Sequence, residues 1–294
     1  MTFLAPRSLS EALELRAAHP AAVPLAGGTD VMVGVNAGTR RPALLDLTRV
    51  PELREWTVRD GIVRLGAGVT YSRVVRELSR LLPGLSAAGA TVGSAQIRNR
   101  ATVGGNVATA SPAGDGVPPL IAAGAEVELS SVREVRRIPL ARFATGPKRT
   151  VLAADELVTA VLVPVRTGPQ AFAKIGGRNA MVIAVANVAV DLRPDRREVG
   201  AAIGAAAATV RHAPAAAHLA ATELNWAARH PADTALLREF GALIAAAAAP
   251  IDDVRGTAAY RRHALAVIAA RALGWAWDEY RATTRNEEPF CTSP

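Results

Sequence analysis

A glycine-dense segment over residues 93–115 constrains this chain more than any other feature. It reads Gly-Ser-Ala-Gln-Ile-Arg-Asn-Arg-Ala-Thr-Val-Gly-Gly-Asn-Val-Ala-Thr-Ala-Ser-Pro-Ala-Gly-Asp. The segment is too apolar for a solvent-exposed linker and too rich in glycine for a regular core helix, yet its backbone polar groups still need partners. A Gly-Gly pair taken alone is most often a tight turn. A long segment of this composition instead indicates backbone that lies against a bound ligand.

A second glycine loop, Gly27-Gly28-Thr29, lies nearer the N-terminus, after a β-like run and before the apolar run 31–35. Gly104-Gly105-Asn106 repeats this arrangement, with Thr102 and Thr109 as flanking hydroxyl groups. Paired glycines at a turn between a strand and a helix let several backbone N–H groups converge on a phosphate. We therefore expect the two loops to hold the two phosphates of one pyrophosphate. Neither loop has the spacing of a Rossmann or P-loop motif, which argues against the ordinary NAD and ATP folds.

Length and cysteine content limit the remaining possibilities. The chain has 294 residues, which suggests about two domains, and its composition is that of a globular protein. Because Cys291 is the only cysteine, the chain cannot form an internal disulfide, a zinc site of several cysteines or an iron–sulfur cluster. Any such centre would have to belong to another chain. The first residues lack the pattern of a secretory signal, and Asn187 interrupts the apolar stretch 180–190, which argues against a spanning helix. We expect a cytoplasmic protein in a reducing compartment.

The net charge of +8 does not by itself indicate a nucleic-acid-binding protein. Aromatic residues make up 4% of the chain, too few for base stacking, and no helix-turn-helix, zinc-finger or RNA-binding signature is present. The five histidines lie outside both loops and show no metal-ligand spacing. We therefore predict neither a catalytic residue nor a metal ligand in this chain.

The order of the expected elements predicts an α+β protein. Residues 1–168 mix helices and strands: Asp60-Gly61 predicts a β-hairpin, and a helix over 70–82 is expected to end at Pro83-Gly84. A meander of three strands and about three helices follows in a separate domain over 169–285, and residues 286–294 form a tail. The strands of the meander are expected at residues 171–175, 183–192 and 198–205.

Residues 24–31, together with the glycine-dense segment 93–115, resemble the FAD-binding medium subunit of the molybdenum hydroxylases, the group of carbon monoxide dehydrogenase and xanthine dehydrogenase. Residues 260–273 resemble the last helix of that family's C-terminal flavoprotein domain. The resemblance implies an FAD-binding domain of two α/β subdomains, of the vanillyl-alcohol-oxidase or PCMH type, followed by the small C-terminal domain.

The resemblance also implies a set of cofactor contacts. Residues 24–31 and 102–106 would hold the pyrophosphate, Asp115 the ribityl or ribose hydroxyls, and Val158 the isoalloxazine, with Lys174 nearby and Thr109 as a further polar contact. From the residues alone, a local cap for Asp115 and an outward-facing strand position for Lys174 remain alternatives. Because no histidine lies in the loops, we expect noncovalent FAD. The predicted contacts are Pro24, Leu25, Ala26, Gly27, Gly28, Thr29, Asp30, Val31, Thr102, Val103, Gly104, Gly105, Asn106, Thr109, Asp115, Val158 and Lys174.

The resemblance implies a role in electron transfer. A small partner subunit with [2Fe–2S] clusters would pass electrons to the FAD, which would reduce an external acceptor, and a large partner subunit would hold the molybdenum cofactor. A dimer of heterotrimers is the expected assembly. The arginine-rich stretch 133–149 would face an acidic surface of the iron–sulfur subunit. A stand-alone flavin oxidoreductase of the same fold and a flavin-free assembly subunit are the alternatives.

Overall fold

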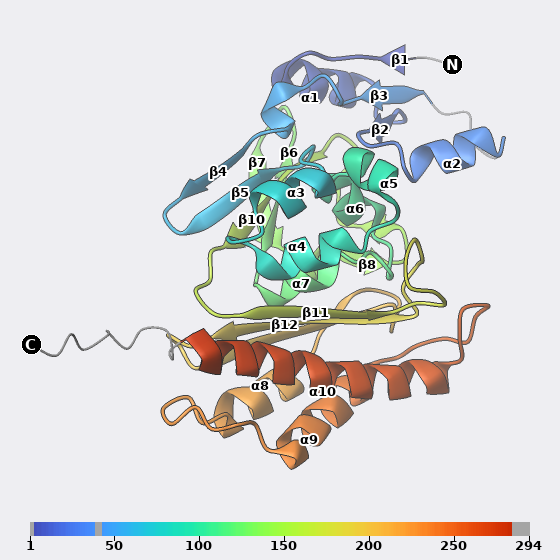
Figure 1. The fold of residues 1–294 in the computed structure, drawn as a ribbon. Helices are drawn as coiled ribbons and strands as arrows, with labels where there is room; N and C mark the ends of the chain where they lie inside the picture. The colour runs from blue at the N-terminus through green and yellow to red at the C-terminus, as the bar shows by residue number, and fades with distance from the viewer. Residues whose placement is uncertain (1–2, 39–42, 284–294) are drawn as a thin grey trace, which may run out of the picture.

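The structure is a computed structural model that describes residues 3–38 and 43–283. Figure 1 shows two parts stacked on each other: strands and short helices of the N-terminal part above, and a sheet with long helix α10 beneath it. The predicted tail over 286–294, including Cys291, lies outside the described residues. In the described ranges, no helix has the length and apolar character needed to cross a membrane.

The first subdomain is a small parallel sheet in the order β1-β3-β2. The hydroxyl of Ser8 caps the first helix by accepting a hydrogen bond from the N–H of Glu11. A turn of five residues, 26–30, joins the second strand to the second helix. The elements are β1 (Phe3–Leu4), α1 (Leu9–Ala18), β2 (Val23–Leu25), α2 (Val31–Asn36) and β3 (Leu44–Asp46).

The second subdomain is built on an antiparallel sheet in the order β4-β5-β10-β6-β7. The predicted hairpin is confirmed: Asp60 and Gly61 join β4 to β5, and both have positive φ angles, 51° and 71°. Strand β10 is central and buried over nearly its whole length, as its apolar sequence predicts. The elements are η1 (Pro51–Leu53), β4 (Trp56–Arg59), β5 (Ile62–Gly66), β6 (Glu126–Ser130), β7 (Val135–Pro139), η2 (Leu140–Arg142), β8 (Ala144–Gly146), β9 (Arg149–Thr150) and β10 (Leu157–Pro164).

The segment between β5 and β6 differs from the sequence prediction. The helix expected over 70–82 ends at Glu77, and Pro83, expected to end it, begins the next helix, because a proline at the first helical position needs no N–H partner. The glycine-dense segment forms short helices, and Gly104 and Gly105 lie in the first turn of one of them, not in the predicted turn between a strand and a helix. The helices between β5 and β6 are α3 (Tyr71–Glu77), α4 (Pro83–Ala90), α5 (Ala95–Arg100), α6 (Val103–Thr109) and α7 (Val117–Ala122).

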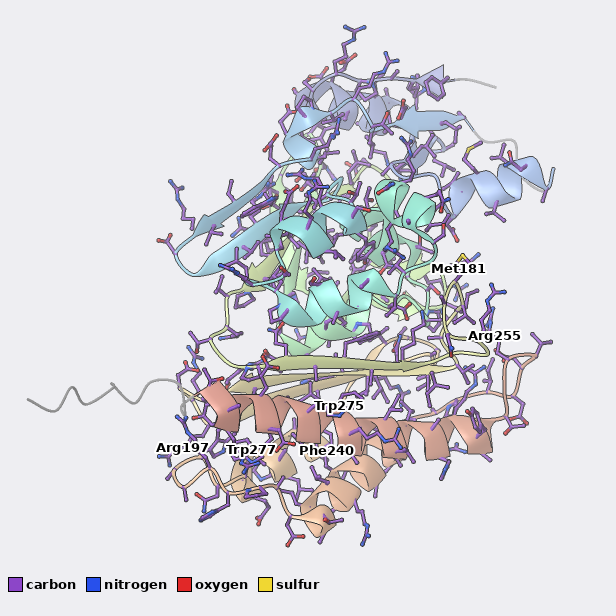
Figure 2. The ribbon with its side chains drawn as sticks, viewed as in Figure 1. Met181, Arg197, Phe240, Arg255, Trp275 and Trp277 are labelled. Carbon is purple, nitrogen blue, oxygen red and sulfur yellow. The ribbon has the colours of Figure 1, made fainter. Side chains whose placement is uncertain are left out.

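The C-terminal part is an antiparallel sheet in the order β11-β12-β13-β14, followed by the three predicted helices. The two-residue strand β14 corrects the predicted three-stranded meander, because so short a strand shows no alternation in the sequence. Trp277 and Phe240, labelled in Figure 2, belong to the core that these helices share with the sheet. The elements are β11 (Gln170–Ile175), β12 (Ala186–Arg193), β13 (Glu198–Gly204), β14 (Arg211–His212), α8 (Pro214–Glu223), α9 (Thr234–Ala246) and α10 (Ala258–Thr283).

The face of this C-terminal sheet opposite α10 packs on helices α4 and α7 of the N-terminal part (Figure 1). Specific hydrogen bonds cross this contact. The side chain of Gln170 on β11 accepts from the N–H of Gly84 at 2.9 Å, and the N–H of Ala205 donates to the carbonyl of Pro112 at 2.7 Å. The C-terminal sheet is therefore joined directly to the segment that begins α4 and to the turn that follows α6.

Candidate functional site

A cavity of about 790 Å³ lies among both subdomains and a loop of the C-terminal part. The loop joins β11 to β12 and contributes Met181, which Figure 2 shows on the side of the molecule where α5 lies. The volume is in the range of cofactor sites. Most of the predicted contacts line it: Pro24, Ala26, Gly27, Gly28, Thr29, Asp30, Val31, Thr102, Gly104, Gly105, Asn106, Thr109, Asp115 and Val158.

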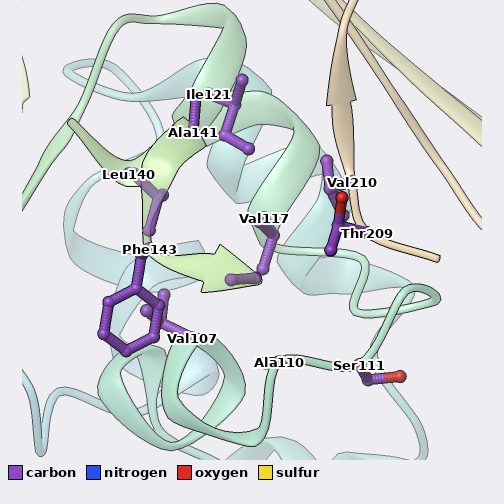
Figure 3. Close-up of a pocket in the computed structure, with 11 residues that line it drawn as sticks. Val107, Ala110, Ser111, Val117, Ile121, Leu140, Ala141, Phe143, Thr209 and Val210 are labelled. Atoms are coloured by element: carbon purple, nitrogen blue, oxygen red, sulfur yellow. The ribbon is translucent and has the colours of Figure 1, made fainter. Parts of the chain in front are cut away.

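Three of the predicted contacts, Leu25, Val103 and Lys174, are described by the structure but do not line this cavity. A second cavity, shown in Figure 3, lies between α6, α7 and the segment before β14. Its volume is about 20 Å³, and Val107, Phe143 and Val210 are among its apolar walls. It has room for about one water molecule and no titratable lining residue. The large cavity is therefore the candidate site.

The first glycine loop presents unbonded backbone donors to the large cavity. Gly28 has a φ of +74°, a conformation that side chains disfavour, and the loop packs so tightly that a Cβ on Gly27 would lie 2.1 Å from the carbonyl oxygen of Arg100. Among the described residues, no acceptor bonds the N–H groups of residues 27–30. Residues 27–29 are half-buried and Asp30 is exposed, and a row of N–H groups without protein acceptors on a cavity wall suits an anion.

The second glycine loop folds as the first turn of α6 and, by contrast, every N–H group of residues 103–106 has a protein acceptor. The N–H groups of Val103 and Gly104 donate to the carbonyls of Val69 and Ala67, both at 2.9 Å. The N–H of Gly105 donates to the hydroxyl of Thr102, and the N–H of Asn106 donates to the Thr102 carbonyl, both at 3.0 Å. The expectation that both loops offer their amides to a pyrophosphate therefore holds, in this structure, for the first loop alone.

Positive side chains without carboxylate partners also line the cavity. Among the described residues, Arg16, Arg54, Arg100 and Lys148 line it and form no ion pair. Burial lowers the pKa of Arg16, and its Nε atom is buried without a partner. Of the three lining carboxylates, Glu156 is paired with Arg136 and Asp115 with Lys174, while Asp30 forms no ion pair within the described residues. The excess of positive charge suits a phosphate-bearing ligand, and no local sequence pattern marks these four residues as a group.

Asp115 is the most constrained polar group of the cavity wall. It is 7% exposed, and its Oδ2 accepts from Nζ of Lys174 at 2.5 Å while its Oδ1 accepts from Nδ2 of Asn187 at 2.8 Å. Burial raises the pKa of Asp115, and the hydrogen bonds from Lys174 and Asn187 oppose that rise. The sequence resemblance implied that Lys174 lies near the cofactor, but Asn187 was not identified as a site residue. The signal that could have identified Asn187 is a polar residue inside an otherwise apolar strand.

Tyr71 holds the side chain of Asn106 in place. The Tyr71 side chain is fully buried, and its hydroxyl donates to Oδ1 of Asn106 at 2.8 Å. Burial, and then the negative charge of Asp115, raise the pKa of Tyr71 well above its usual value, so this hydroxyl remains a donor. A Cβ on Gly116 would lie 1.9 Å from the hydroxyl oxygen, so only glycine leaves room for it. The sequence alone did not identify Tyr71.

The arginine-rich stretch 133–149 is partly neutralised within the chain. Arg133 pairs with Asp155, Arg136 with Glu156, and Arg137 with Glu128. These carboxylates come from β6 and from the segment before β10, which the sequence does not reveal as neighbours. The stretch therefore presents less free positive charge to a partner than its composition indicates.

Comparisons with known proteins identify the family of this chain. Residues 1–166 match the family described as "FAD binding domain in molybdopterin dehydrogenase", and residues 171–276 match "CO dehydrogenase flavoprotein C-terminal domain". The first of these matches indicates that the chain contains an FAD-binding domain. The chain belongs to the FAD-binding subunits of the molybdopterin hydroxylases, the family of carbon monoxide and xanthine dehydrogenase medium subunits, as its sequence resemblance predicts. It is an oxidoreductase subunit.

The relatives are similar over most of the chain. The xanthine dehydrogenase FAD-binding subunit of Escherichia coli O157:H7 is 34% identical over 216 residues, covering 69% of this chain and 73% of its own. The nicotine 6-hydroxylase medium subunit of Paenarthrobacter nicotinovorans is 30% identical and covers 92% and 95%. A solved carbon monoxide dehydrogenase of Hydrogenophaga pseudoflava superimposes with a TM-score of 0.87 at 26% identity, covering 95% of this chain and 98% of that chain.

Proposed function

We propose that this chain binds FAD noncovalently in the large cavity and transfers electrons from [2Fe–2S] clusters of a partner subunit to an external acceptor. The observation that carries the proposal is the row of free N–H groups at residues 27–30, in a cavity that unpaired cations also line. Bound FAD would supply the redox chemistry, since flavins exchange electrons singly or in pairs, and the protein would supply binding and orientation.

Each wall of the cavity has a distinct task in this proposal. The amides of residues 27–30 would hold the diphosphate, assisted by Arg16 and Arg100. Asp115 would accept a hydrogen bond from a cofactor hydroxyl, because a carboxylate has about four acceptor sites and its protein donors do not fill them all. Val158, 7% exposed, offers an apolar surface to the isoalloxazine ring. The remaining predicted contacts stay predictions.

The partner subunits and the domain division belong to the same proposal. A large subunit would hold the molybdenum cofactor and a small one the [2Fe–2S] clusters, in a dimer of heterotrimers. Relatives named "FAD-binding subunit" and "medium subunit" support a multi-subunit assembly, and a chain with one cysteine cannot ligate such clusters itself. We place an FAD-binding domain of the vanillyl-alcohol-oxidase type at 1–168 and the C-terminal domain at 169–285.

Flavin uptake tests the proposal directly. Purified chain is incubated with FAD, freed of unbound cofactor and examined by visible absorption. We expect about one FAD per chain, released intact by acid or heat because no covalent bond holds it. A chain that remains colourless would instead be a flavin-free assembly subunit. Co-expression with candidate partners then separates the proposal, in which molybdenum and iron co-purify, from a stand-alone flavin oxidoreductase, in which they do not.

A further inference from the structure

A pair of adjacent residues on the C-terminal sheet holds both oxygens of Asp115. Lys174 on β11 and Asn187 on β12 are directly opposite each other in the strand register. Each donates to a different oxygen of Asp115, at 2.5 Å and 2.8 Å. Lys174 also donates to the carbonyl of Thr91 at the end of α4. The C-terminal sheet thereby reaches a residue of the cavity wall across the contact between the two parts of the molecule.

Within the described residues, the side chain of Asn187 makes no hydrogen bond to its own sheet. Its side chain is fully buried, its Nδ2 donates to Asp115, and its Oδ1 has no hydrogen-bond partner among the described residues. Gly204, its neighbour on β13, leaves space for this amide, because a Cβ there would lie 2.3 Å from the Asn187 Oδ1. An unpaired buried amide oxygen destabilises a protein, and an apolar residue would avoid that penalty. The polar residue is therefore explained by its contact with Asp115.

Neither Lys174 nor Asn187 lines the cavity, whereas Asp115 does. We propose that Asn187 is a positioning residue: with Lys174 it fixes the orientation of the Asp115 carboxylate, so that Asn187 contributes to FAD affinity without lining the cavity. This inference rests on the proposed function.

The physical basis is orientation and reciprocity. Two donors on different strands fix both oxygens of Asp115, so little side-chain freedom remains to be lost when a cofactor hydroxyl binds. Without the Asn187 donor, Oδ1 would lose this hydrogen bond, and the buried carboxylate would turn toward its remaining partners. Because linkage is reciprocal, FAD bound against Asp115 also stabilises the docking of the C-terminal sheet.

The test compares two isosteric substitutions at the same domain contact. Asn187→Leu removes the donor to Asp115. Gln170→Met removes a side chain of β11 that accepts from Gly84 across the contact and donates to Asp191 on the neighbouring strand β12. Gln170 does not line the cavity. FAD affinity is measured by titration of flavin fluorescence. We expect Asn187→Leu to weaken FAD about tenfold, the scale of one hydrogen bond to a charged group, and Gln170→Met to change it less than twofold.

A double-mutant cycle shows whether Asn187 acts through Asp115. In an Asp115→Ala background, Asn187→Leu is expected to cause no further loss of affinity. An equal loss in both backgrounds, an equal loss with Gln170→Met, or no loss at all in Asn187→Leu would overturn the inference while wild-type FAD binding upheld the proposed function. Wild-type protein that binds no FAD would overturn both. If Asn187→Leu does not fold, as judged by circular dichroism, Asn187→Ser replaces it, since serine is too short to reach Asp115.

Discussion

The two glycine loops have the same Gly-Gly pair but use it differently. In the first loop the backbone N–H groups of residues 27–30 are free and line the cavity. In the second loop all four N–H groups of residues 103–106 are bonded within the protein. A Gly-Gly pair on a cavity wall therefore does not by itself identify a phosphate-binding loop. What distinguishes the loops is whether neighbouring segments already satisfy their amides.

The glycines of the second loop serve close packing. A Cβ on Gly104 would lie 2.3 Å from the Cβ of Ala67, at the point where α6 meets the end of β5. Gly28 in the first loop is different: a Cβ there would meet only flexible side chains at 3.3 Å or more, and the glycine is required by its φ of +74°. One glycine thus provides space and the other provides conformation, which leads to substitutions with different outcomes.

The largest effect is expected for Gly104→Ala. The added methyl group overlaps the backbone of Ala67, which cannot move without disturbing strand β5. We expect the free energy of unfolding to fall by about 3 kcal/mol, measured by urea denaturation of the flavin-free chain. An unchanged denaturation midpoint would contradict the packing role of the second loop.

Gly28→Ala is expected to have a smaller effect on stability and a larger one on FAD. A residue with a Cβ loses about 1–2 kcal/mol in the left-handed backbone conformation that Gly28 adopts. If the backbone rotated to relieve this strain, the N–H groups of the loop would no longer point at the diphosphate. We expect FAD affinity to fall about tenfold or more in a fluorescence titration. Gly28→Asn is the control, because asparagine tolerates positive φ, and it should retain more of the affinity. Equal losses for the two variants would argue against a conformational cause.

Thr102→Ala tests the bonded state of the second loop. The hydroxyl of Thr102 caps α6 by accepting from the N–H of Gly105, so its removal is expected to lower stability by about 1 kcal/mol. Thermal unfolding of the flavin-free chain measures this loss, and Thr102→Ser should restore it, since serine keeps the cap. If both variants unfold at the same temperature, the cap contributes nothing and the Gly105 amide is available to a ligand.

The smallest effect is expected for Arg100→Gln, which removes one unpaired charge beside the first loop. Arg100 is exposed, so solvent and salt screen its attraction for a diphosphate. We expect about a threefold loss of FAD affinity at low ionic strength that disappears at about 1 M salt. A loss that persists at high salt would mean that Arg100 acts by shape and not by charge.

Much of the fold was predictable because its signals are local. The hairpin at Asp60-Gly61, the buried strand β10 and the C-terminal helices each follow from residues close together in the chain. The prediction was wrong at Pro83, where one residue type can either end a helix or begin one, and the neighbouring packing decides. The two-residue strand β14 was missed because it is shorter than any periodic pattern.

The candidate site was predictable in part. The sequence resemblance singled out both glycine loops, Asp115 and Val158, and the structure brings them to one cavity. Arg16, Tyr71 and Asn187 were missed, because each acquires its role from a partner far away in sequence. Asn187 left a trace as the polar interruption of an apolar strand, which is also the pattern of an ordinary edge or bulge position.

Periodicity and motifs within short stretches of chain were enough to predict the α+β class, the places of the two Gly-Gly pairs and the family. Which loop keeps its amides free, and which residues hold Asp115, became known from the folded chain alone. Those properties depend on hydrogen bonds between segments that folding brings together, Ala67 with Gly104 and Asn187 with Asp115. A buried polar group takes its partner from whatever the fold places beside it, and local sequence does not record that choice.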